Sequence, residues 1–358
     1  MASVTATDRD RELDRFYADV AAADLQPLWT QTRNLMPNEP APAARPWLWK
    51  WRDVRGLCER AGRLVPIERG GERRVLSLAN PGLGGLPFAT STLWGAFQYL
   101  GAGESAPAHR HSPGAIRFVI EGEGAWTTVD GDACDMTPGD LVLTPSWCWH
   151  DHENGGDRPM IWFDGLDMPT VIALDAVFFE PHPDAAQAVT GRNASERLYG
   201  GRATIPAAAR HPVPHSPLLV YRWRDTDAAL AALLAESREP MATLRYVNPL
   251  TGEAALPTLG CEMTRLVERK RTRPARKVGS SVYVVFRGRG VSVIDGVEFE
   301  WAAGDSFVVP SWAVIEHQAD EPADLFAIDD RPLLERLALF REAELDEPQK
   351  IRERFQPR

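Results

Sequence analysis

The stretch that decides the fold is EGEGAWTTVDGDACDMTPGDLVLTPSW, residues 121–147, because a related stretch, RGRGVSVIDGVEFEWAAGDSFVVPSW, occupies residues 287–312. One deletion in the second stretch aligns the two, and identical residues then coincide at the turn positions. The matched residues are Gly122, Gly124, Asp130, Gly131, Gly139, Asp140, Pro145, Ser146 and Trp147 with Gly288, Gly290, Asp295, Gly296, Gly304, Asp305, Pro310, Ser311 and Trp312. Glycine and aspartate are typical of turns, and short apolar runs separate them. The repeat therefore predicts two copies of one β-domain.

The pattern outside the repeat divides the chain into four parts and favours an all-β protein with helices near both ends. The parts are an N-terminal helical and extended arm (1–70), a first β-domain (71–190), a linker with one helix (191–240) and a second β-domain (241–358). Apolar residues at helical spacing predict helices over residues 8–30 and 333–344, and an alanine-rich patch at 228–235 predicts the helix of the linker. The segment around Trp47, Trp49 and Trp51 is either a strand or a loop held by its aromatic residues.

Length and composition exclude several classes of protein. The chain has 358 residues, 44% of them hydrophobic and 25% charged, which is typical of a globular domain rather than a disordered chain. No apolar run reaches the roughly 18 residues of a membrane span. The polar N-terminus lacks the apolar core of a secretory signal, so we expect a cytoplasmic protein that binds no membrane. The net charge of −10 gives no electrostatic support for a nucleic-acid partner, and four widely separated cysteines disfavour a disulfide scaffold.

Histidines flank the first copy of the repeat on both sides. His109 and His111 form a His-x-His pair before it, and His150 and His152 form a second pair after it. Residues i and i+2 of a strand point to the same face, so His109 and His111 can reach one ion, with His150 supplied by a neighbouring strand. Three imidazoles suit iron, zinc, copper or nickel and leave coordination positions open for a substrate. The alternative is that these histidines are polar residues at strand ends, but two such pairs around one repeat favour a metal site.

The second copy of the repeat lacks this histidine set. Ala275, Lys277 and Ile315 stand at the positions of His109, His111 and His150. None of the three is a useful ligand there, and the lysine would repel a cation. We therefore expect a metal-free second domain, in which His317, opposite His152, has a structural role.

The histidine motifs resemble those of the cupins. The first motif runs from Gly103 through His109-Arg110-His111 to Gly122, and the second runs from Gly139 through Pro145 to His150 and Asn154. The glutamate that often ligates the metal in cupins is replaced by Ala115, and this departure resembles the gentisate 1,2-dioxygenase family. These are bicupins that include salicylate and 1-hydroxy-2-naphthoate dioxygenases. Further similar stretches are ERRVLSLANPGL (72–83), HRHSPGAIRFVIEGEGAWTTVDG (109–131), GDLVLTPSWCWHDHENGG (139–156) and WFDGLDMP (162–169).

The resemblance implies a double-stranded β-helix fold, an Fe(II) cofactor and a homotetramer. The implied reaction inserts O2 between the carboxyl-bearing and the adjacent hydroxyl-bearing carbons of a small aromatic hydroxy acid. Gentisate is the preferred substrate, with salicylate, a substituted salicylate or 1-hydroxy-2-naphthoate as rivals. Two other classes are possible from the motifs: a non-catalytic ligand-binding bicupin, and a metal-dependent sugar-phosphate isomerase. An open three-histidine site argues against the first, and the missing glutamate argues against the second.

Two arginines are candidates for holding the substrate carboxylate. Arg117 shares the face of His111 by strand parity, and its neighbours Ile116, Phe118 and Val119 indicate a buried strand, in which an arginine needs an anionic partner. The family resemblance suggests Arg73 as the second candidate. Arg74 has the opposite parity and is expected to be exposed.

The remaining candidate site residues depend on the resemblance. It implies that His152 hydrogen-bonds the substrate hydroxyl and takes its proton, and that Asp164 orients neighbouring groups through hydrogen bonds. Trp94, Ala96 and Gln98 would line the substrate pocket, with Trp94 as a flat wall and the small Ala96 leaving room for ring substituents. Simpler interpretations exist for each of these residues. His152 could be a polar residue at a strand end and Asp164 a residue of a surface turn. Trp94, Ala96 and Gln98 could belong to an ordinary core strand.

Overall fold

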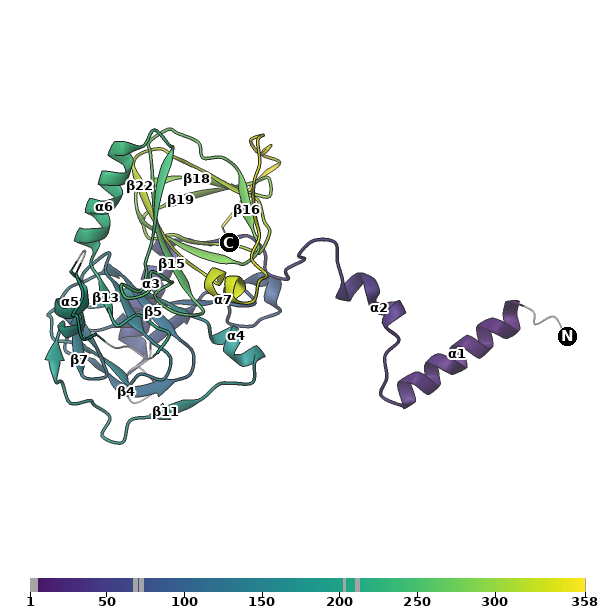
Figure 1. Ribbon diagram of the computed structural model, residues 1–358, viewed down its shortest axis with the longest axis horizontal. Coiled ribbons are helices and arrows are strands. Elements are labelled where there is room, and N and C mark those ends of the chain that lie inside the picture. Colours follow the sequence, from purple (N-terminus) through teal and green to yellow (C-terminus); the bar gives the residue numbers. More distant parts are fainter. Residues whose placement is uncertain (1–5, 67–69, 71–73, 202–203, 210–212, 358) are drawn as a thin grey trace. The chain divides into compact units, whose positions relative to one another are not determined.

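The computed structural model describes residues 6–66, 70, 74–201, 204–209 and 213–357 (Figure 1). The chain divides into two compact units, residues 1–41 and 42–358. The first unit contains helices α1 (Ala6–Ala22) and α2 (Leu28–Leu35), so the prediction of one helix over 8–30 is wrong. The chain turns between them because Asp24 adopts a left-handed conformation with φ 52°, and Pro27 is most readily accommodated at the start of a helix.

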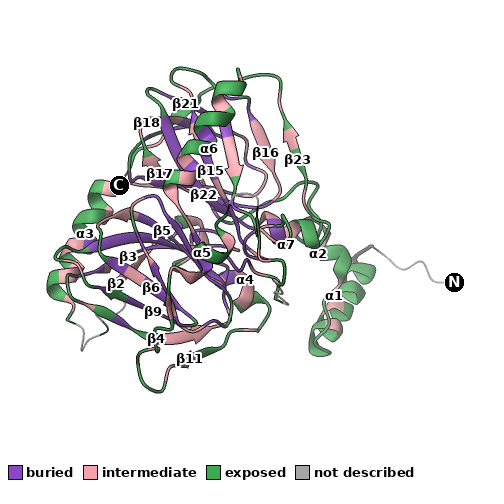
Figure 2. Ribbon diagram, turned by 60° about the vertical axis from the view of Figure 1, so that its left-hand side comes forward, coloured by how far each residue is buried: buried purple, intermediate pink, exposed green. Residues whose placement is uncertain are grey.

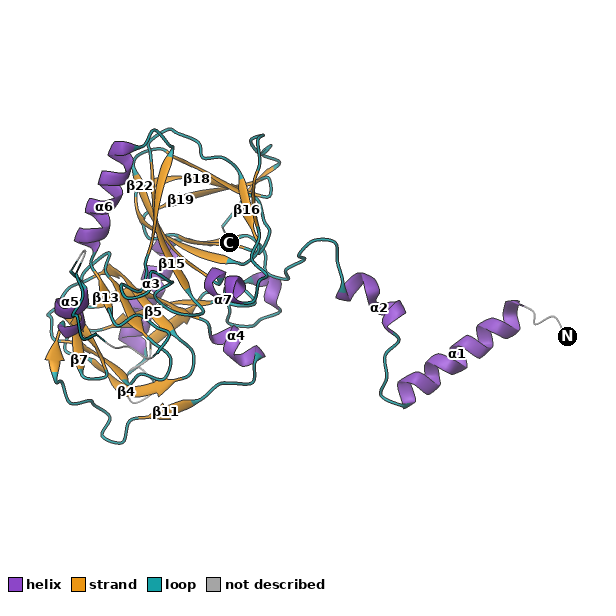
Figure 3. Cartoon of the chain, viewed as in Figure 1, coloured by secondary structure: helices purple, strands orange, loops and turns teal. Residues whose placement is uncertain are grey.

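The second unit consists mainly of strands, which form four sheets of six strands each among the described residues (Figure 3). One sheet of the first barrel contains, in spatial order, β13 (Val220–Tyr221), β8 (Leu141–Thr144), β5 (Ala115–Glu121), β10 (Met160–Leu166), β3 (Trp94–Leu100) and β2 (Arg74–Ser77). The other contains β11 (Phe179–Pro181), β4 (Ser105–His111), β9 (His150–Asn154), β6 (Ala125–Val129), β7 (Asp132–Asp135) and β12 (Gly191–Arg192).

The second barrel repeats this order strand for strand. One sheet contains β1 (Trp47–Trp49), β20 (Ser306–Val309), β17 (Ser281–Arg287), β22 (Ala323–Asp329), β15 (Gly260–Leu266) and β14 (Met241–Arg245). The other contains β23 (Glu342–Glu344), β16 (Ala275–Lys277), β21 (Ile315–Ala319), β18 (Arg289–Ile294), β19 (Val297–Ala302) and β24 (Glu353–Arg354). The predicted fold, two copies of one β-barrel with helices near the ends of the chain, is confirmed. The boundaries at residues 70, 190 and 240 stay a prediction.

One hydrophobic cluster joins the two barrels, in addition to a cluster inside each. Its buried residues come from both barrels, and the rings of Phe118 and Phe326 stack on each other with centroids 4.1 Å apart and planes at 2°. Figure 2 shows the buried strands running through both barrels. Helices α4 (Met168–Ala173) and α7 (Arg331–Arg336) follow the matching strands β10 and β22, and α5 (Ala194–Tyr199) lies beside β7.

Each barrel is covered by the helix that precedes it in the sequence, and the start of that helix is capped by the other barrel. Helix α3 (Trp51–Leu64) packs on β2 and β3 of the first barrel, but its first backbone N–H, that of Trp51, donates to Asp305 of the second barrel at 2.8 Å. Helix α6 (Trp223–Glu236) packs on β14 and β15 of the second barrel, and the N–H of Trp223 donates to Asp140 of the first barrel at 2.9 Å. The repeated Gly-Asp turns therefore cap helices, a role that favours acidic residues.

The C-terminal helix is shorter than predicted. Helix α7 ends at Arg336, and residues 342–344, expected to be helical, form strand β23. Ala338 adopts φ 57°, which stops the helix. The following residues then pair with the edge of β16, so that unpaired backbone groups of the barrel are satisfied. Among the described residues, no helix is long and apolar enough to cross a membrane.

Candidate functional site

Three histidines converge inside the first barrel. His109 and His111 lie two residues apart on β4, and His150 lies directly opposite His109 on β9. Their ring centroids are 4.3 to 5.6 Å apart, and one ligand atom of each lies within 4.8 Å of the others. The alternation of side chains along β4 and the register between β4 and β9 place the three rings together, as the sequence predicted.

Backbone carbonyls orient all three imidazoles in the same way. The Nδ1 atom of each ring lies within hydrogen-bond distance of the carbonyl oxygen of a residue two positions away in the sequence. The partners are Pro107 for His109 (2.9 Å), Pro113 for His111 (2.7 Å) and Cys148 for His150 (3.0 Å). A ring whose Nδ1–H donates to a carbonyl carries its lone pair on Nε2. The site thus offers three Nε2 atoms as ligands, each oriented by a second hydrogen bond, as is usual at metal sites.

The surroundings of the His150 ring indicate whether a metal ion fits the three-histidine site. Its Nε2 is buried and has no hydrogen-bond partner within the described part of the chain. Burial, helped by the positive charge of Arg117, holds the pKa of His150 well below its usual value, so the ring is neutral and able to ligate. A buried ring nitrogen without a partner is costly unless an ion or a ligand satisfies it. The donor set therefore fits a divalent transition metal.

Arg117 and Asp164 form a buried ion pair beside the histidines. They lie opposite each other on β5 and β10, and Arg117 also donates to the hydroxyl of Thr144 on β8. The Nε of Arg117 is buried without a hydrogen-bond partner among the described residues. Burial raises the pKa of Asp164 to about 6, against the opposing effects of Arg117 and of the Trp162 indole, which donates to Asp164 at 2.9 Å.

The three residues that the resemblance implies for the substrate pocket lie on strand β3. Trp94, Ala96 and Gln98 alternate along one face of it, and Ala96 lies opposite Asp164 on β10. Ala96 is fully buried and Gln98 is 5% exposed, whereas the Trp94 indole donates to the hydroxyl of Ser77 at 3.1 Å. All three thus face the interior of the first barrel, on the sheet that carries Arg117.

Of the two adjacent arginines, Arg73 lies outside the described residues, and the expectation that Arg74 is exposed is wrong. Arg74 is only 5% exposed. Its guanidinium pairs with Glu104 and donates to the carbonyl oxygen of Gly62 in α3 at 3.1 Å. The side chain does point away from the barrel interior, as its parity predicts. However, helix α3 covers this outer face, which strand alternation alone does not reveal.

His152 lies two residues beyond His150 on β9 and is also buried. It is 3% exposed, its Nδ1 is 2.9 Å from the hydroxyl of Thr127, and its ring centroid is 5.3 Å from that of Trp162. The equivalent pair in the second barrel is His317 and Ser292, 2.7 Å apart. This shared arrangement supports the barrel frame in both copies.

Two features near the histidines carry no local sequence signal. The ring of Phe179, on edge strand β11, lies 5.3 Å from that of His109, and Arg110, between the two histidines of β4, lies over Trp147 and Trp149 at 4.4 Å from each. Both contacts depend on pairing between segments distant in sequence. In the second barrel Lys277 occupies the His111 position, and its ammonium pairs with Asp329 at 2.6 Å. Among the described residues that barrel has no matching histidine cluster.

Comparisons with known proteins agree with this architecture. Residues 96–166 match the model of the Cupin domain. The chain is 49% identical to a gentisate 1,2-dioxygenase of Streptomyces sp over 352 residues, 95% of this chain and 98% of the relative. The chain belongs to the gentisate 1,2-dioxygenase family. It is also 38% identical to a 5-aminosalicylate 1,2-dioxygenase of Comamonas sp, over 92% of this chain and 90% of that one.

The solved structures extend the agreement to three dimensions. The gentisate adduct of the salicylate 1,2-dioxygenase from Pseudoaminobacter salicylatoxidans superposes with a TM-score of 0.90 and 42% identity, over 97% of each chain. Members of the gentisate 1,2-dioxygenase family are ring-cleaving dioxygenases. The predicted family, the bicupin fold and the enzyme class are therefore confirmed.

Proposed function

We propose that this member of the gentisate 1,2-dioxygenase family uses Fe(II) to insert O2 into gentisate or a related substituted salicylate. In this reaction the bond between the carboxyl-bearing and the adjacent hydroxyl-bearing carbons breaks. Each carbon gains one oxygen atom, so both atoms of O2 enter the product and no external reductant is needed. The observation that carries the proposal is the set of three Nε2 atoms beside a buried arginine.

His109, His111 and His150 would hold the iron. Three neutral ligands leave about three of six octahedral positions for other groups. When bound, Fe(II) supplies a centre that brings an electron-rich aromatic ring and O2 together. The hydrogen bonds at Nδ1 favour the tautomer of each imidazole whose Nε2 lone pair is free to ligate.

Arg117 would bind the substrate carboxylate. Its guanidinium is buried, and its Nε has no hydrogen-bond partner among the described residues beyond the long ion-pair contact with Asp164, so an anion brought into the barrel satisfies a donor that lacks a direct hydrogen bond. Asp164 at 3.6 Å holds the guanidinium in place without closing the donor off. We extend the proposal to Arg73 as a second contact to the carboxylate.

The aromatic ring would lie against β3. Trp94 offers a flat apolar surface and Gln98 offers both a donor and an acceptor. Ala96, between them, leaves space for a substituent on the ring, which agrees with substrates such as gentisate that carry a further group. His152 would accept the proton of the substrate hydroxyl, since it is the buried base next in line on β9.

The preferred substrate is gentisate, because its second hydroxyl makes the ring electron-rich. The gentisate bound to the similar salicylate dioxygenase supports this choice, whereas the similar 5-aminosalicylate enzyme points to an amino group at the same ring position. The predicted homotetramer stays a prediction, which light scattering tests.

An oxygen electrode tests the proposed function. We expect O2 uptake with gentisate or another hydroxybenzoate, and no uptake with benzoate, which cannot chelate through an ortho oxygen. The His150→Ala variant should be inactive, whereas His215→Ala, at a half-buried histidine of the linker, should retain activity. No O2 uptake by the iron-loaded enzyme with gentisate, salicylate, 5-aminosalicylate or 1-hydroxy-2-naphthoate would refute the proposal.

A further inference from the structure

The second barrel contains a cavity of about 530 Å³ at the place where the first barrel carries its histidines. Its lining includes Ala275, Lys277 and Ile315, which stand at the positions of the three metal ligands, and Tyr283. The volume lies within the range of small-molecule sites, about 300–1,000 Å³. The second barrel has thus lost the ligand set while retaining the space.

The features proposed to hold an aromatic acid are absent from this cavity. In the first barrel Arg117 lies opposite Asp164; at the same register of the second barrel Tyr283 lies opposite Ala327. The position of Ala96, opposite Asp164, is taken by Glu262, opposite Ala327. A carboxylate would meet a glutamate where the first barrel offers only a methyl group. The cavity therefore recognises something other than the substrate of the first barrel.

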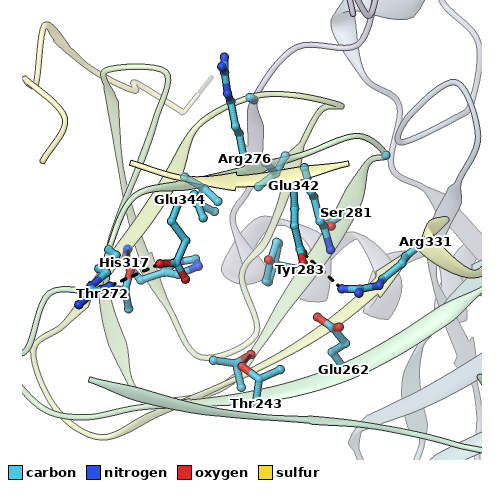
Figure 4. A pocket seen from close by; sticks show the side chains of 18 of the residues that line it. Thr243, Glu262, Thr272, Arg276, Ser281, Tyr283, His317, Arg331, Glu342 and Glu344 are labelled. Carbon is cyan, nitrogen blue, oxygen red and sulfur yellow. Dashed lines mark hydrogen bonds and ion pairs between the residues drawn. The ribbon is translucent and has the colours of Figure 1, made fainter. Parts of the chain in front are cut away.

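The charges around the cavity are already paired. The ammonium of Lys277 lies 2.6 Å from Asp329, and the Nε of Arg245 lies 2.9 Å from Glu262. Arg331, from α7, contacts Glu335 at 2.6 Å and Glu342 at 3.6 Å. Arg276 points away from the cavity and lies over the ring of Trp312 (Figure 4). A charged molecule entering the cavity would compete with these pairs, and at the pair of Lys277 with Asp329, where the aspartate is 4% exposed, it would leave a buried carboxylate without its partner, which is strongly unfavourable.

Both neutral and ion-paired side chains offer hydrogen bonds to a molecule in the cavity. The hydroxyls of Thr243 and Thr264 face each other at 2.8 Å on β14 and β15, and the side chains of Glu262, Tyr283 and Arg331 turn toward the same space (Figure 4). Charged groups that are paired with each other still accept or donate hydrogen bonds to a hydroxyl, and such bonds are stronger than those between neutral groups. The wall thus presents several strong partners to an uncharged polar molecule.

Part of the cavity lining is apolar. It includes Val309, Pro310, Ala313 and Ile315, and the Tyr283 ring stacks on Phe307 with centroids 4.8 Å apart, which fixes its orientation. A lining that combines apolar side chains with hydrogen-bonding groups matches a ring that has C–H faces and hydroxyl edges.

From these observations we propose that the second barrel binds an uncharged polyhydroxylated ring of about monosaccharide size. Binding requires no metal and no chemistry in the first barrel, and it does not depend on the proposed function. In this assignment the ion pair of Lys277 and Asp329 occupies the place that the metal centre has in the first barrel. The second barrel is then a binding domain and not an inactive copy of the first.

Saturation-transfer difference NMR on the iron-loaded full chain tests the proposal. The probes are D-glucose and myo-inositol, with glucuronate and glucosamine as charged relatives of the same size. We expect saturation transfer to a neutral probe and at least tenfold weaker binding of both charged ones. A crystal soaked with the binding probe should show it in the second barrel. No transfer to either neutral probe, or stronger binding of glucuronate or glucosamine, would overturn the proposal.

Substitutions locate the site in solution. Glu262→Gln removes a charge-assisted hydrogen bond and should weaken the neutral probe about tenfold, whereas Thr243→Val should weaken it about fivefold. Glu268→Gln is the matched control, because Glu268 is exposed and pairs with its neighbour Arg269. Equal affinities in Glu262→Gln, Thr243→Val and the control would place the probe elsewhere and contradict the assignment.

Discussion

Arg117 and Asp164 lie opposite each other on neighbouring strands, with the arginine Nε 3.6 Å from the aspartate Oδ1 and both side chains 5% exposed. The pair is longer than a direct hydrogen bond. An isolated buried ion pair at this distance contributes little to stability, and the second barrel replaces it with Tyr283 and Ala327 without changing the strand order. We therefore propose that the pair serves ligand binding.

Replacing Arg117 tests its role as the anchor of the carboxylate. Arg117→Ala should raise the KM for carboxylated substrates roughly tenfold to a hundredfold, the range expected when a charge-assisted hydrogen bond is lost. The iron content should stay unchanged, since Arg117 is not a ligand. Steady-state kinetics and metal analysis measure the two quantities. An unchanged KM for every carboxylated substrate would remove Arg117 from the binding site.

The raised pKa of Asp164 predicts a specific pH dependence of stability. Burial raises this pKa from 3.8 to about 6, so the folded protein retains a proton that the unfolded chain has released. Relative to Asp164→Asn, which does not titrate, the wild-type protein should therefore lose stability as the pH rises from about 4 to above 6, by about 3 kcal/mol in total.

Denaturant unfolding of the metal-free proteins, at several pH values in this range, measures the difference without a contribution from metal loss. A difference that is constant with pH, or that grows in favour of the wild type as the pH rises, would show that Asp164 is ionised throughout.

Two aspartates join the barrels reciprocally. Asp330 of the second barrel accepts a hydrogen bond from Thr92 of the first at 2.6 Å, and Asp167 of the first accepts one from Thr258 of the second. Thr92→Val and Thr258→Val should each lower the free energy of unfolding by about 1–3 kcal/mol, because each leaves a buried carboxylate oxygen without its partner. Thermal denaturation measures the change. Wild-type stability in both variants would indicate that water replaces the hydroxyls.

The turn at Gly139 and Asp140, which contacts the start of α6, should not accommodate a side chain at position 139. Gly139 has φ 88°, and a Cβ there would meet the ring of Trp223. Gly139→Ala should therefore destabilise the protein by about 2–4 kcal/mol. Gly56→Ala is the matched control. Gly56 lies in helix α3 with open space around it, and the substitution should stabilise the protein by about 0.5–1 kcal/mol. The opposite order of the two melting temperatures would contradict this account of the turn.

The sequence predicted those features that depend on local alternation or on the internal repeat. His109 and His111 share a face because strand side chains alternate, and the aligned second copy correctly identified Lys277 as a replacement for a ligand. The outward direction of Arg74 also follows from alternation. The burial of Arg74 does not follow from alternation. Helix α3 covers this side chain, and nothing in the local sequence indicates which strands α3 packs against.

Long-range pairing explains the other differences. Residues 342–344 have helical spacing, yet the open edge of β16 offers them backbone partners. Strand β1 joins a sheet of the second barrel through β20, more than 250 positions further along the chain. The paired charges of the second cavity likewise come from β14, β15, β16, β22 and α7, so the repeat alignment alone could reveal the loss of the metal site but not the cavity that replaces it.

The iron content of the anaerobically reconstituted chain is the decisive measurement for the three-histidine centre. We expect one tightly bound Fe(II) per chain, none in His150→Ala, and no change when Lys277 of the second barrel is replaced by alanine. Two iron ions per wild-type chain, or a full complement of iron in His150→Ala, would contradict a single three-histidine centre in the first barrel.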